Sequence, residues 1–516
     1  SAQLNPNLLS DAEIQSQQLS LIALSATIDQ NQNTALSLEA LVPNLGDVPE
    51  WNYYMGDAQA ALGNKKLATE YYYSCSERSP AEIDYRSNCA NSLWHLLLES
   101  SENSSAALTA AEPNYRAWME LAILTQNNRG LVETQTKLLE RWFSTYANHP
   151  ARLNPPLEIL NLIQLELKIP SSIALVLPLS GRLQSAGEAV LDGFLSAVYL
   201  TSAQGYSAAE IEIFDSGALP IELIAEIIST ENFDIVVGPL DTENVESFAR
   251  SVSKELAVLY LNKVSNTEYR PNTQIGFSLA VESEAQQAAQ TAMLYGHRSA
   301  LVLIEDSEIG ERAAGAFAED WIQEDRQIYD IVRLSDATTL TKRLEQSFHV
   351  DQSESRKSQL QTLLGKRLEF TPRRRQDIDT IFLASNSTLA RQITPTLAFL
   401  FAEDIPVLAT SRVFDENSDS EDNRDLAAVN FLSPPWLAEA IQPLEQSLST
   451  RPLELQKLEA MGVDAFYLGR RFEQLSSPEF RYQGKTGSIS VGQDGNLRRT
   501  MEWVRIDGEK MVSANL

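Results

Sequence analysis

The sequence predicts two structural classes in one chain, an α plus α/β arrangement. An all-α domain of helical repeats occupies residues 1–165, and a two-lobed α/β domain occupies residues 166–516. Before about residue 168, apolar residues recur at helical spacing and glycine is rare. After residue 172, short apolar runs alternate with helical segments in two successive series. At 516 residues the chain also exceeds what one hydrophobic core usually supports.

The first domain contains one clear helix-pair unit at residues 50–80, EWNYYMGDAQAALGNKKLATEYYYSCSERSP. Its spacing of small residues, Gly56, Gly63 and Ala68, resembles a tetratricopeptide repeat closed by Pro80. A weaker match begins at Tyr115, and the segment 83–114 between them is expected to be a degenerate repeat. Such repeats stack because one helix pair cannot bury its apolar face alone. A partner-binding surface and a simple spacer both fit this domain.

The second domain is expected to hold two parallel sheets. The predicted strands of the first lobe, which starts near 172, are 173–177, 211–215, 233–240, 257–262 and 275–279. Those of the second lobe, which starts near 281, are 299–305, 327–334, 378–385 and 405–410. Helical segments between the strands imply right-handed crossovers.

The end of the chain departs from this pattern. A helix is expected at 461–472, and residues 484–516 then alternate with a period of two. Asp494-Gly495 and Asp507-Gly508 are dipeptides typical of hairpin turns. We expect a C-terminal hairpin element at 484–516 that is added to the second lobe.

The order of these motifs resembles the type I periplasmic binding proteins. In that fold the first strand ends in a PLSG-like loop, the third in a Gly-Pro loop, and a TGxVxFDxxG hairpin lies near the C-terminus. Here the corresponding segments are 178–181, Gly238-Pro239, and Thr486-Gly487 with Asp494-Gly495. The resemblance covers residues 172–516.

The resemblance implies a cleft between the lobes, because ligands in open α/β sheets lie at the carboxyl ends of strands. Asp241 and Glu243 stand where amino-acid receptors place serine or threonine, so they would repel a ligand carboxylate, although they also suit a helix cap. A cationic group or a sugar-peptide fragment stays open as a ligand. The candidate cleft-lining residues are Pro178, Ser180, Gly238, Pro239, Asp241, Thr242 and Asn262.

A basic insertion between Phe348 and Ile378 distinguishes the second lobe from transport receptors. It carries seven basic and four acidic residues in a chain of net charge -29. A solvated loop is the simplest interpretation. The alternative is a partner-binding surface formed by Arg373, Arg374 and Arg375, because charge of one sign steers association.

Composition argues against several other functions. The acidic charge makes nucleic acid a poor partner, and no run of about 18 apolar residues or signal peptide is visible. The four histidines form no metal motif, and Gly484-Lys485-Thr486 lacks the first glycine and the following helix of a phosphate loop. We therefore expect no catalytic residues, no metal and no cofactor. Cys75 and Cys89 would meet only if their helices are adjacent.

Helical repeats ahead of a binding-protein fold are similar to a family of outer-membrane lipoproteins that activate class A penicillin-binding proteins. The supporting stretches are ALVLPLSG, VVGPL, RRRQDID, MGVDAF and GKTGSISV. The resemblance implies a non-catalytic, monomeric regulator of peptidoglycan synthesis at the periplasmic face of the outer membrane. Its lipid anchor is an N-terminal modified cysteine, which this chain does not show. The alternative is a periplasmic solute receptor that closes on a small ligand.

Overall fold

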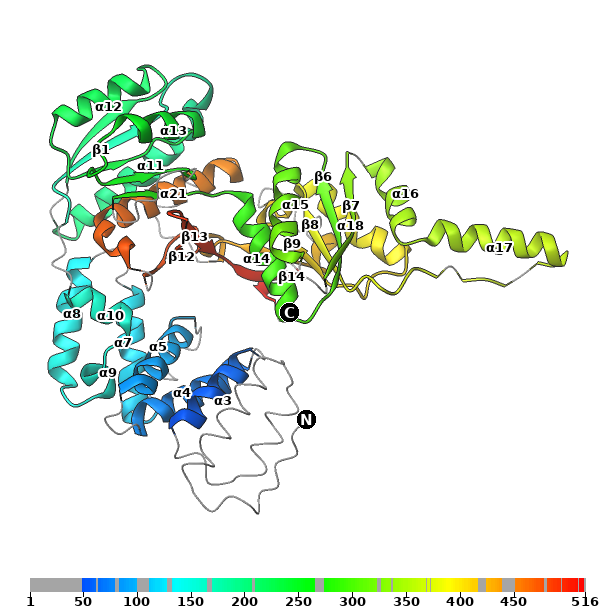
Figure 1. Cartoon of the computed structure of the whole chain (residues 1–516), viewed down its shortest axis with the longest axis horizontal. Helices are drawn as coiled ribbons and strands as arrows, with labels where there is room; N and C mark the ends of the chain where they lie inside the picture. Colours follow the sequence, from blue (N-terminus) through cyan, green and yellow to red (C-terminus); the bar gives the residue numbers. More distant parts are fainter. Residues whose placement is uncertain are drawn as a thin grey trace, which may run out of the picture. The chain divides into compact units, whose positions relative to one another are not determined.

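The computed structural model divides into two compact units, Ser1–Leu167 and Lys168–Leu516. Figure 1 shows their helices and strands. The structure describes residues 49–61, 64–78, 83–99, 111–127, 132–164, 169–206, 209–264, 273–322, 326–335, 337–367, 369–371, 373–415, 424–438, 451–477, 480–492, 494–508 and 510–514.

The described part of the first unit is helical. Gly56 lies where two helices meet, since a Cβ there would sit 2.4 Å from the Tyr72 ring. Trp118, Leu121 and Ala122, which marked the weaker repeat, are fully buried in the core of this unit. Gly63 and Pro80 fall outside the described residues. The helices are α3 (Pro49–Ala61), α4 (Lys65–Arg78), α5 (Ile83–Glu99), α7 (Pro113–Asn127), α8 (Val132–Thr145), α9 (Pro150–Leu153) and α10 (Leu157–Gln164).

A disulfide joins α4 to α5. Cys75 and Cys89 are both fully buried, and their Cα atoms are 6.0 Å apart. The two helices are thus close enough for the pairing that the sequence left open. Disulfides of this kind persist in oxidising compartments such as the bacterial periplasm.

The first lobe of the second unit is a parallel sheet with strand order β2-β1-β3-β4-β5. Alternate residues of β1 face opposite cores: Ile173 and Leu175 pack with α11 and α21, whereas Ala174 and Val176 pack with α12 and α13. The elements are β1 (Ser172–Leu177), α11 (Gln184–Ala203), β2 (Glu210–Asp215), α12 (Ile221–Thr230), β3 (Ile235–Val237), α13 (Thr242–Ser251), β4 (Val258–Tyr260), β5 (Gln274–Gly276) and, from much later in the chain, α21 (Leu453–Arg470).

The second lobe has a mixed sheet of order β15-β14-β10-β9-β8-β6-β7. The predicted strands 299–305 and 327–334 are confirmed, while β10 is a strand that the sequence analysis does not predict. The elements are α14 (Val281–Leu294), β6 (Ser299–Glu305), α15 (Glu308–Trp321), β7 (Gln327–Leu334), α16 (Ala337–Ser347), α17 (Val350–Leu364), β8 (Thr380–Ala384), α18 (Ser387–Phe399), β9 (Val407–Ala409), β10 (Val429–Ser433), α20 (Pro435–Ala438), β14 (Glu502–Asp507) and β15 (Lys510–Ser513).

The C-terminal tail is divided between the lobes, so the expectation that it joins only the second lobe is wrong. β11 (Arg481–Gln483), β12 (Ser488–Val491) and β13 (Leu497–Thr500) form a separate sheet. Its side chains Tyr482 and Ile489 pack into the core of the first lobe. β14 and β15 extend the second-lobe sheet instead. Both predicted Asp-Gly turns are confirmed, since Gly495 and Gly508 have φ of 79° and 64° between paired strands.

The basic insertion is also not a simple loop. Residues Val350–Leu364 form the helix α17, in which only Val350 and Ser353 are buried. Figure 1 shows α17 extending away from the sheet of the second lobe, with the chain returning beside it. The helix begins at the buried Val350 and ends at Gly365, which adopts a left-handed φ of 61°.

Candidate functional site

The candidate cleft residues Pro178 and Ser180 lie in the loop after β1, which the neighbouring strand holds in place. The carboxylate of Asp215, at the end of β2, accepts the backbone N–H groups of Leu179 and Gly217, each at 2.8 Å. Burial opposes ionisation of Asp215, but these bonds and one from Ser180 keep its pKa below the ordinary value. The loop therefore uses its polar groups within its own lobe.

The Gly238-Pro239 loop is shaped by close backbone packing. Gly238 has a φ of 106°, and a Cβ there would lie 2.0 Å from the carbonyl oxygen of Val176 in β1. Only glycine fits both requirements. The carbonyl of Pro239 accepts the N–H of Leu261 at 3.1 Å.

The start of α13 is capped by the chain itself. Asp241 accepts the backbone N–H of Asn244 at 3.0 Å and its side-chain amide at 2.7 Å. Asn262, at the end of β4, donates to the carbonyl of Leu240 at 2.8 Å and to the hydroxyl of Thr242 at 3.4 Å. The helix N-terminus, which could bind a ligand carboxylate, already has a carboxylate from Asp241.

The structure thus brings all seven candidate residues to one edge of the first-lobe sheet, as the topology implied. We call the set Pro178, Ser180, Gly238, Pro239, Asp241, Thr242 and Asn262 the first-lobe edge. Its hydrogen bonds run to backbone and side chains of the same lobe. The geometry assigns these residues to holding loops and capping a helix.

Polar contacts that the sequence did not reveal connect the two lobes. Lys457, on α21 of the first lobe, donates to the hydroxyl of Ser411 at 3.3 Å, just after β9 of the second lobe. Arg412 lies 3.5 Å from Glu305 at the end of β6 and 3.9 Å from Glu454 on α21. The carboxyl ends of the second-lobe strands therefore contact a helix of the first lobe.

A buried ion pair lies beside these contacts. Glu284 of α14 and Arg499 of β13 are each less than 10% exposed, and their charged atoms are 3.3 Å apart. Glu284 also accepts the backbone N–H of Ser411 at 2.7 Å, while Arg499 donates to the carbonyl of Thr486 at 3.1 Å. Burial lowers the pKa of Arg499, and Glu284 opposes this. We call Glu284, Ser411, Lys457 and Arg499 the interlobe network.

The motifs MGVDAF and GKTGSISV are joined by hydrogen bonds. Asp464, fully buried on α21, accepts the backbone N–H groups of Lys485 and Thr486 at 2.7 and 2.8 Å and the Thr486 hydroxyl at 2.7 Å. A Cβ on Gly484 would lie 2.5 Å from this carboxylate. Burial raises the pKa of Asp464 to about 6, although these bonds oppose the shift. The sequence signal was an acidic residue within an apolar helix face.

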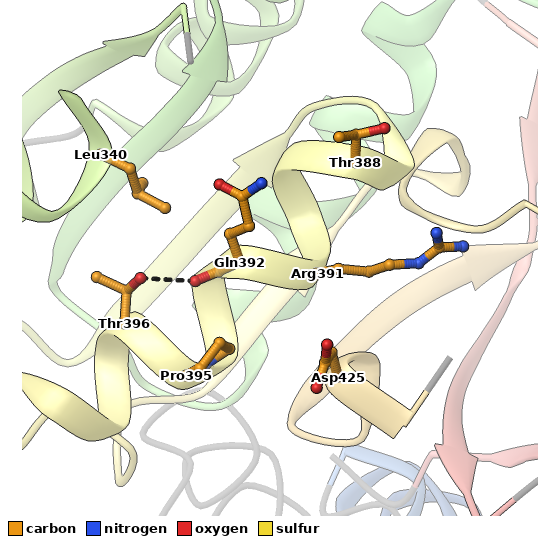
Figure 2. Close-up of a pocket in the computed structure, with 7 residues that line it drawn as sticks. All are labelled: Leu340, Thr388, Arg391, Gln392, Pro395, Thr396 and Asp425. Atoms are coloured by element: carbon orange, nitrogen blue, oxygen red, sulfur yellow. Dashed lines mark hydrogen bonds between the residues drawn. The ribbon is translucent and has the colours of Figure 1, made fainter. Parts of the chain in front are cut away.

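A pocket of about 450 Å³ lies apart from these contacts, within the second lobe. Figure 2 shows residues of α16, α18 and the 3₁₀ turn Arg424–Leu426 around it, with the Thr396 hydroxyl bonded to the carbonyl of Gln392 at 2.7 Å. Its charged members, Arg391 and Asp425, both retain solvent contact. The lining residues are Leu340, Thr388, Arg391, Gln392, Pro395, Thr396 and Asp425.

The three candidate arginines have different surroundings. Arg374 is 7% exposed and donates to the carbonyls of Phe401 and Arg375 and to the Asp404 carboxylate. Arg375 pairs with Asp377 and lies over the Tyr329 ring, 3.0 Å from its centroid. Arg373 alone among the three is exposed. Arg374 and Arg375 therefore fix the base of the insertion, and a surface of three outward arginines is not formed.

Within the described ranges, no group of three or more histidine, cysteine, aspartate or glutamate side chains is arranged to hold a metal ion. In the same part of the chain, none of the helices combines the length and hydropathy that a membrane span needs. The sequence DENSDSEDNRDL at 415–426 differs from a calcium-binding loop at its sixth and twelfth positions, Ser420 and Leu426. Its residues 416–423 fall outside the described residues.

Comparison with known proteins identifies the family. The family described as "LppC putative lipoprotein" matches residues 2–508. The chain belongs to the LppC family. Relatives of this LppC protein include the penicillin-binding protein activator LpoA of Photobacterium profundum, 29% identical over 447 residues that cover 83% of this chain and 72% of the relative. LpoA of Vibrio antiquarius is 28% identical over 471 residues, which cover 87% and 75%.

Solved structures confirm the fold class of this LppC chain. Full-length LpoA from Haemophilus influenzae aligns with a TM-score of 0.53 at 20% identity, covering 98% of this chain and 89% of that protein. The C-domain of the same protein, described as a regulator of PBP1A, aligns with a TM-score of 0.52 at 22% identity over 67% of this chain and all of the domain. The helical domain followed by a two-lobed α/β domain is therefore the family's architecture.

Proposed function

We propose that this protein is a non-catalytic activator that docks on a bifunctional class A penicillin-binding protein and stimulates its transpeptidase. The family match over residues 2–508, with relatives named penicillin-binding protein activators, carries the proposal. Activation needs only that the protein bind the active conformer of the synthase more tightly than the inactive one. No residue of this chain has to perform chemistry.

The first-lobe edge supports docking over solute reception. A receptor for amino acids presents free donors at this edge. Here the carboxylate of Asp241 already accepts the backbone N–H of Asn244, and Asn262 donates its amide to the carbonyl of Leu240. Lys457 and Arg412 also bridge the lobes through direct contacts between protein side chains. These contacts favour a two-lobed domain that acts through its outer surface.

The family name supports a lipid-anchored protein, and we place it at the periplasmic face of the outer membrane as a monomer. The Cys75–Cys89 disulfide fits an oxidising compartment. The domain boundary near 166 allows the helical unit to act as a spacer between the membrane and the α/β domain.

The test is a pull-down of class A penicillin-binding protein from an envelope extract, followed by a transpeptidase assay with the purified pair. We expect recovery of the synthase and faster peptide cross-linking when the chain is added. Failure of both would overturn the proposal. Thermal shift with free amino acids and peptidoglycan fragments tests the alternative, because a ligand of the cleft raises the melting temperature by mass action.

A further inference from the structure

The distal half of α17 exposes apolar side chains that no described part of the chain covers. Leu360, Leu363 and Leu364 are 50%, 81% and 58% exposed. Scattered single apolar residues on a surface are ordinary. Three leucines at positions i, i+3 and i+4 of one projecting helix instead form one continuous face.

This face continues a stripe that is buried at the base of the helix. Val350, Ser353, Lys357, Leu360 and Leu364 follow one another at spacings of three and four residues, which keeps them on one side of a helix. The second lobe covers the first two, which are 6% exposed each. This side of the helix is therefore covered by the protein's own core at one end, and its leucines are bare at the other.

The base of α17 is held firmly. The hydroxyl of Ser353 accepts the N–H of Arg373 at 3.2 Å, and Arg374 binds the carboxylate of Asp404 at 2.6 and 2.7 Å. The bare end is thus presented by an anchored helix, which lowers the entropy that binding must overcome.

The charge around the bare leucines is mainly positive. Residues 354–369 contain four basic side chains, Arg356, Lys357, Lys366 and Arg367, and two acidic ones at the ends of this range, Glu354 and Glu369. The whole chain carries a net charge of -29. The distal part of α17, which we define as residues 356–367, is therefore a basic protrusion on an acidic protein.

These charges limit what kind of partner can bind the exposed leucines of distal α17. A second copy of the chain, or an anionic lipid surface, would be repelled by the net charge of -29 as a whole. A short amphipathic helix with i, i+3 and i+4 anchors instead fits an apolar groove on a protein, and its basic flanks fit carboxylates at the rim of that groove.

We propose that distal α17 is the element that docks on the penicillin-binding protein, inserting Leu360, Leu363 and Leu364 into an apolar groove rimmed by carboxylates. This inference rests on the proposed function and names the surface that performs it. Lys366 and Arg367, just beyond the helix end, face the acidic rim, and Arg373 at the base is the remaining outward charge of the arginine triplet.

The test compares two variants of the full chain with matched controls for binding to the synthase. L360S/L363S/L364S removes the apolar face, and L294S/I322S is its control, since Leu294 and Ile322 are 60% and 62% exposed elsewhere in the second lobe. We expect the Kd to rise at least tenfold for the first and less than twofold for the second. Unchanged melting temperatures show that both variants fold.

A charge variant gives an independent measurement. R356E/K366E/R367E should raise the Kd at least tenfold at low salt and progressively less as ionic strength rises. Its control is R182E/R498E/R505E, which makes the same change in net charge at three exposed arginines elsewhere. The control is expected to lower affinity less than threefold.

The outcomes separate the two proposals. If both α17 variants bind the synthase within twofold of the unmodified chain, and that chain still stimulates it, the α17 inference is wrong and the proposed function stands. If the unmodified chain binds no class A penicillin-binding protein, the proposed function fails and this inference with it. Loss of self-association or of binding to anionic vesicles, with synthase affinity intact, would assign α17 to a different occupant and overturn the inference.

Discussion

The first-lobe edge and distal α17 differ in whether their side chains have partners within the protein. At the first-lobe edge, Asp241 caps α13 and Asn262 ties two loops together, so the polar groups have partners within the lobe. On distal α17, three leucines are at least half exposed and the flanking charges are mainly positive. The edge carries the motifs of the binding-protein fold, but α17 has the properties of an interaction surface.

The difference shows that a motif can be required by the backbone packing around it, apart from any role in binding. Gly238 is required because β1 passes within 2.0 Å of where its Cβ would be, whatever binds nearby. A docking helix has no such internal constraint, because few of its side chains contact its own domain. Four substitutions, from the largest expected change in the free energy of unfolding to the smallest, measure how far each region depends on its internal contacts.

Breaking the interlobe network should lower the free energy of unfolding more than the other three changes. Glu284→Ala leaves the Arg499 guanidinium buried without its counter-charge, so we expect the free energy of unfolding to fall by about 3–5 kcal/mol. Urea denaturation measures this. Glu282→Ala removes the partly exposed partner of Arg312 and should lower the free energy of unfolding by less than about 1 kcal/mol. Equal effects of the two variants would show that the interlobe network is no more important than a surface pair.

Glu459 on α21 gives a pH-dependent test of packing within the first lobe, where α21 meets α11. Its side chain is 7% exposed, and burial raises its pKa to about 7 from an ordinary value near 4.5. A raised pKa in the folded state stabilises the protein below pH 4.5, and this stability is lost as the pH rises through 7.

We therefore expect unmodified protein to lose about 2–3 kcal/mol relative to Glu459→Gln between pH 4.5 and 8, measured by urea unfolding across that range. The glutamine variant cannot ionise and is the matched control. Parallel pH profiles of the two proteins would contradict the shift.

Removing the cap of α13 should have a moderate effect on stability alone. Asp241→Ala leaves the N–H of Asn244 without its acceptor, so we expect a loss of about 1 kcal/mol. Affinity for the synthase should stay within twofold. Glu243→Ala, in the same first helical turn without the cap bond, is the control. A large loss of synthase affinity in Asp241→Ala would return the first-lobe edge to the functional surface.

Distal α17 should show the smallest effect on stability. Leu363 is 81% exposed, so Leu363→Ala removes almost no buried area, and the free energy of unfolding should change by less than about 0.5 kcal/mol. Thermal unfolding and binding to the synthase are measured on the same sample. A loss above about 1 kcal/mol would mean that the chain itself covers this leucine, and the contrast with the first-lobe edge would disappear.

The sequence predicted the regular elements well because they follow local periodicity. The strands 299–305 and 327–334 and both Asp-Gly turns follow from runs of a few residues. The sequence does not reveal β10, although most of its residues are buried. It favours a loop at α17, because the polar and basic residues of this helix mask a helical pattern that only Val350 and Ser353 link to a core. Apolar pattern therefore fails for an element that projects from the core, and it does not detect every buried one.

The sequence by itself determined the two-part architecture, the family and the position of the seven edge residues at the ends of parallel strands. Only the tertiary structure decided their roles, because hydrogen-bond partners such as Asp241 with Asn244, or Asp464 with Thr486, depend on geometry that residue types do not fix. The tertiary structure also gave Arg373 and Arg374 different surroundings. Successive side chains of an extended chain point in opposite directions, so of these identical neighbours only Arg374 is buried against Asp404.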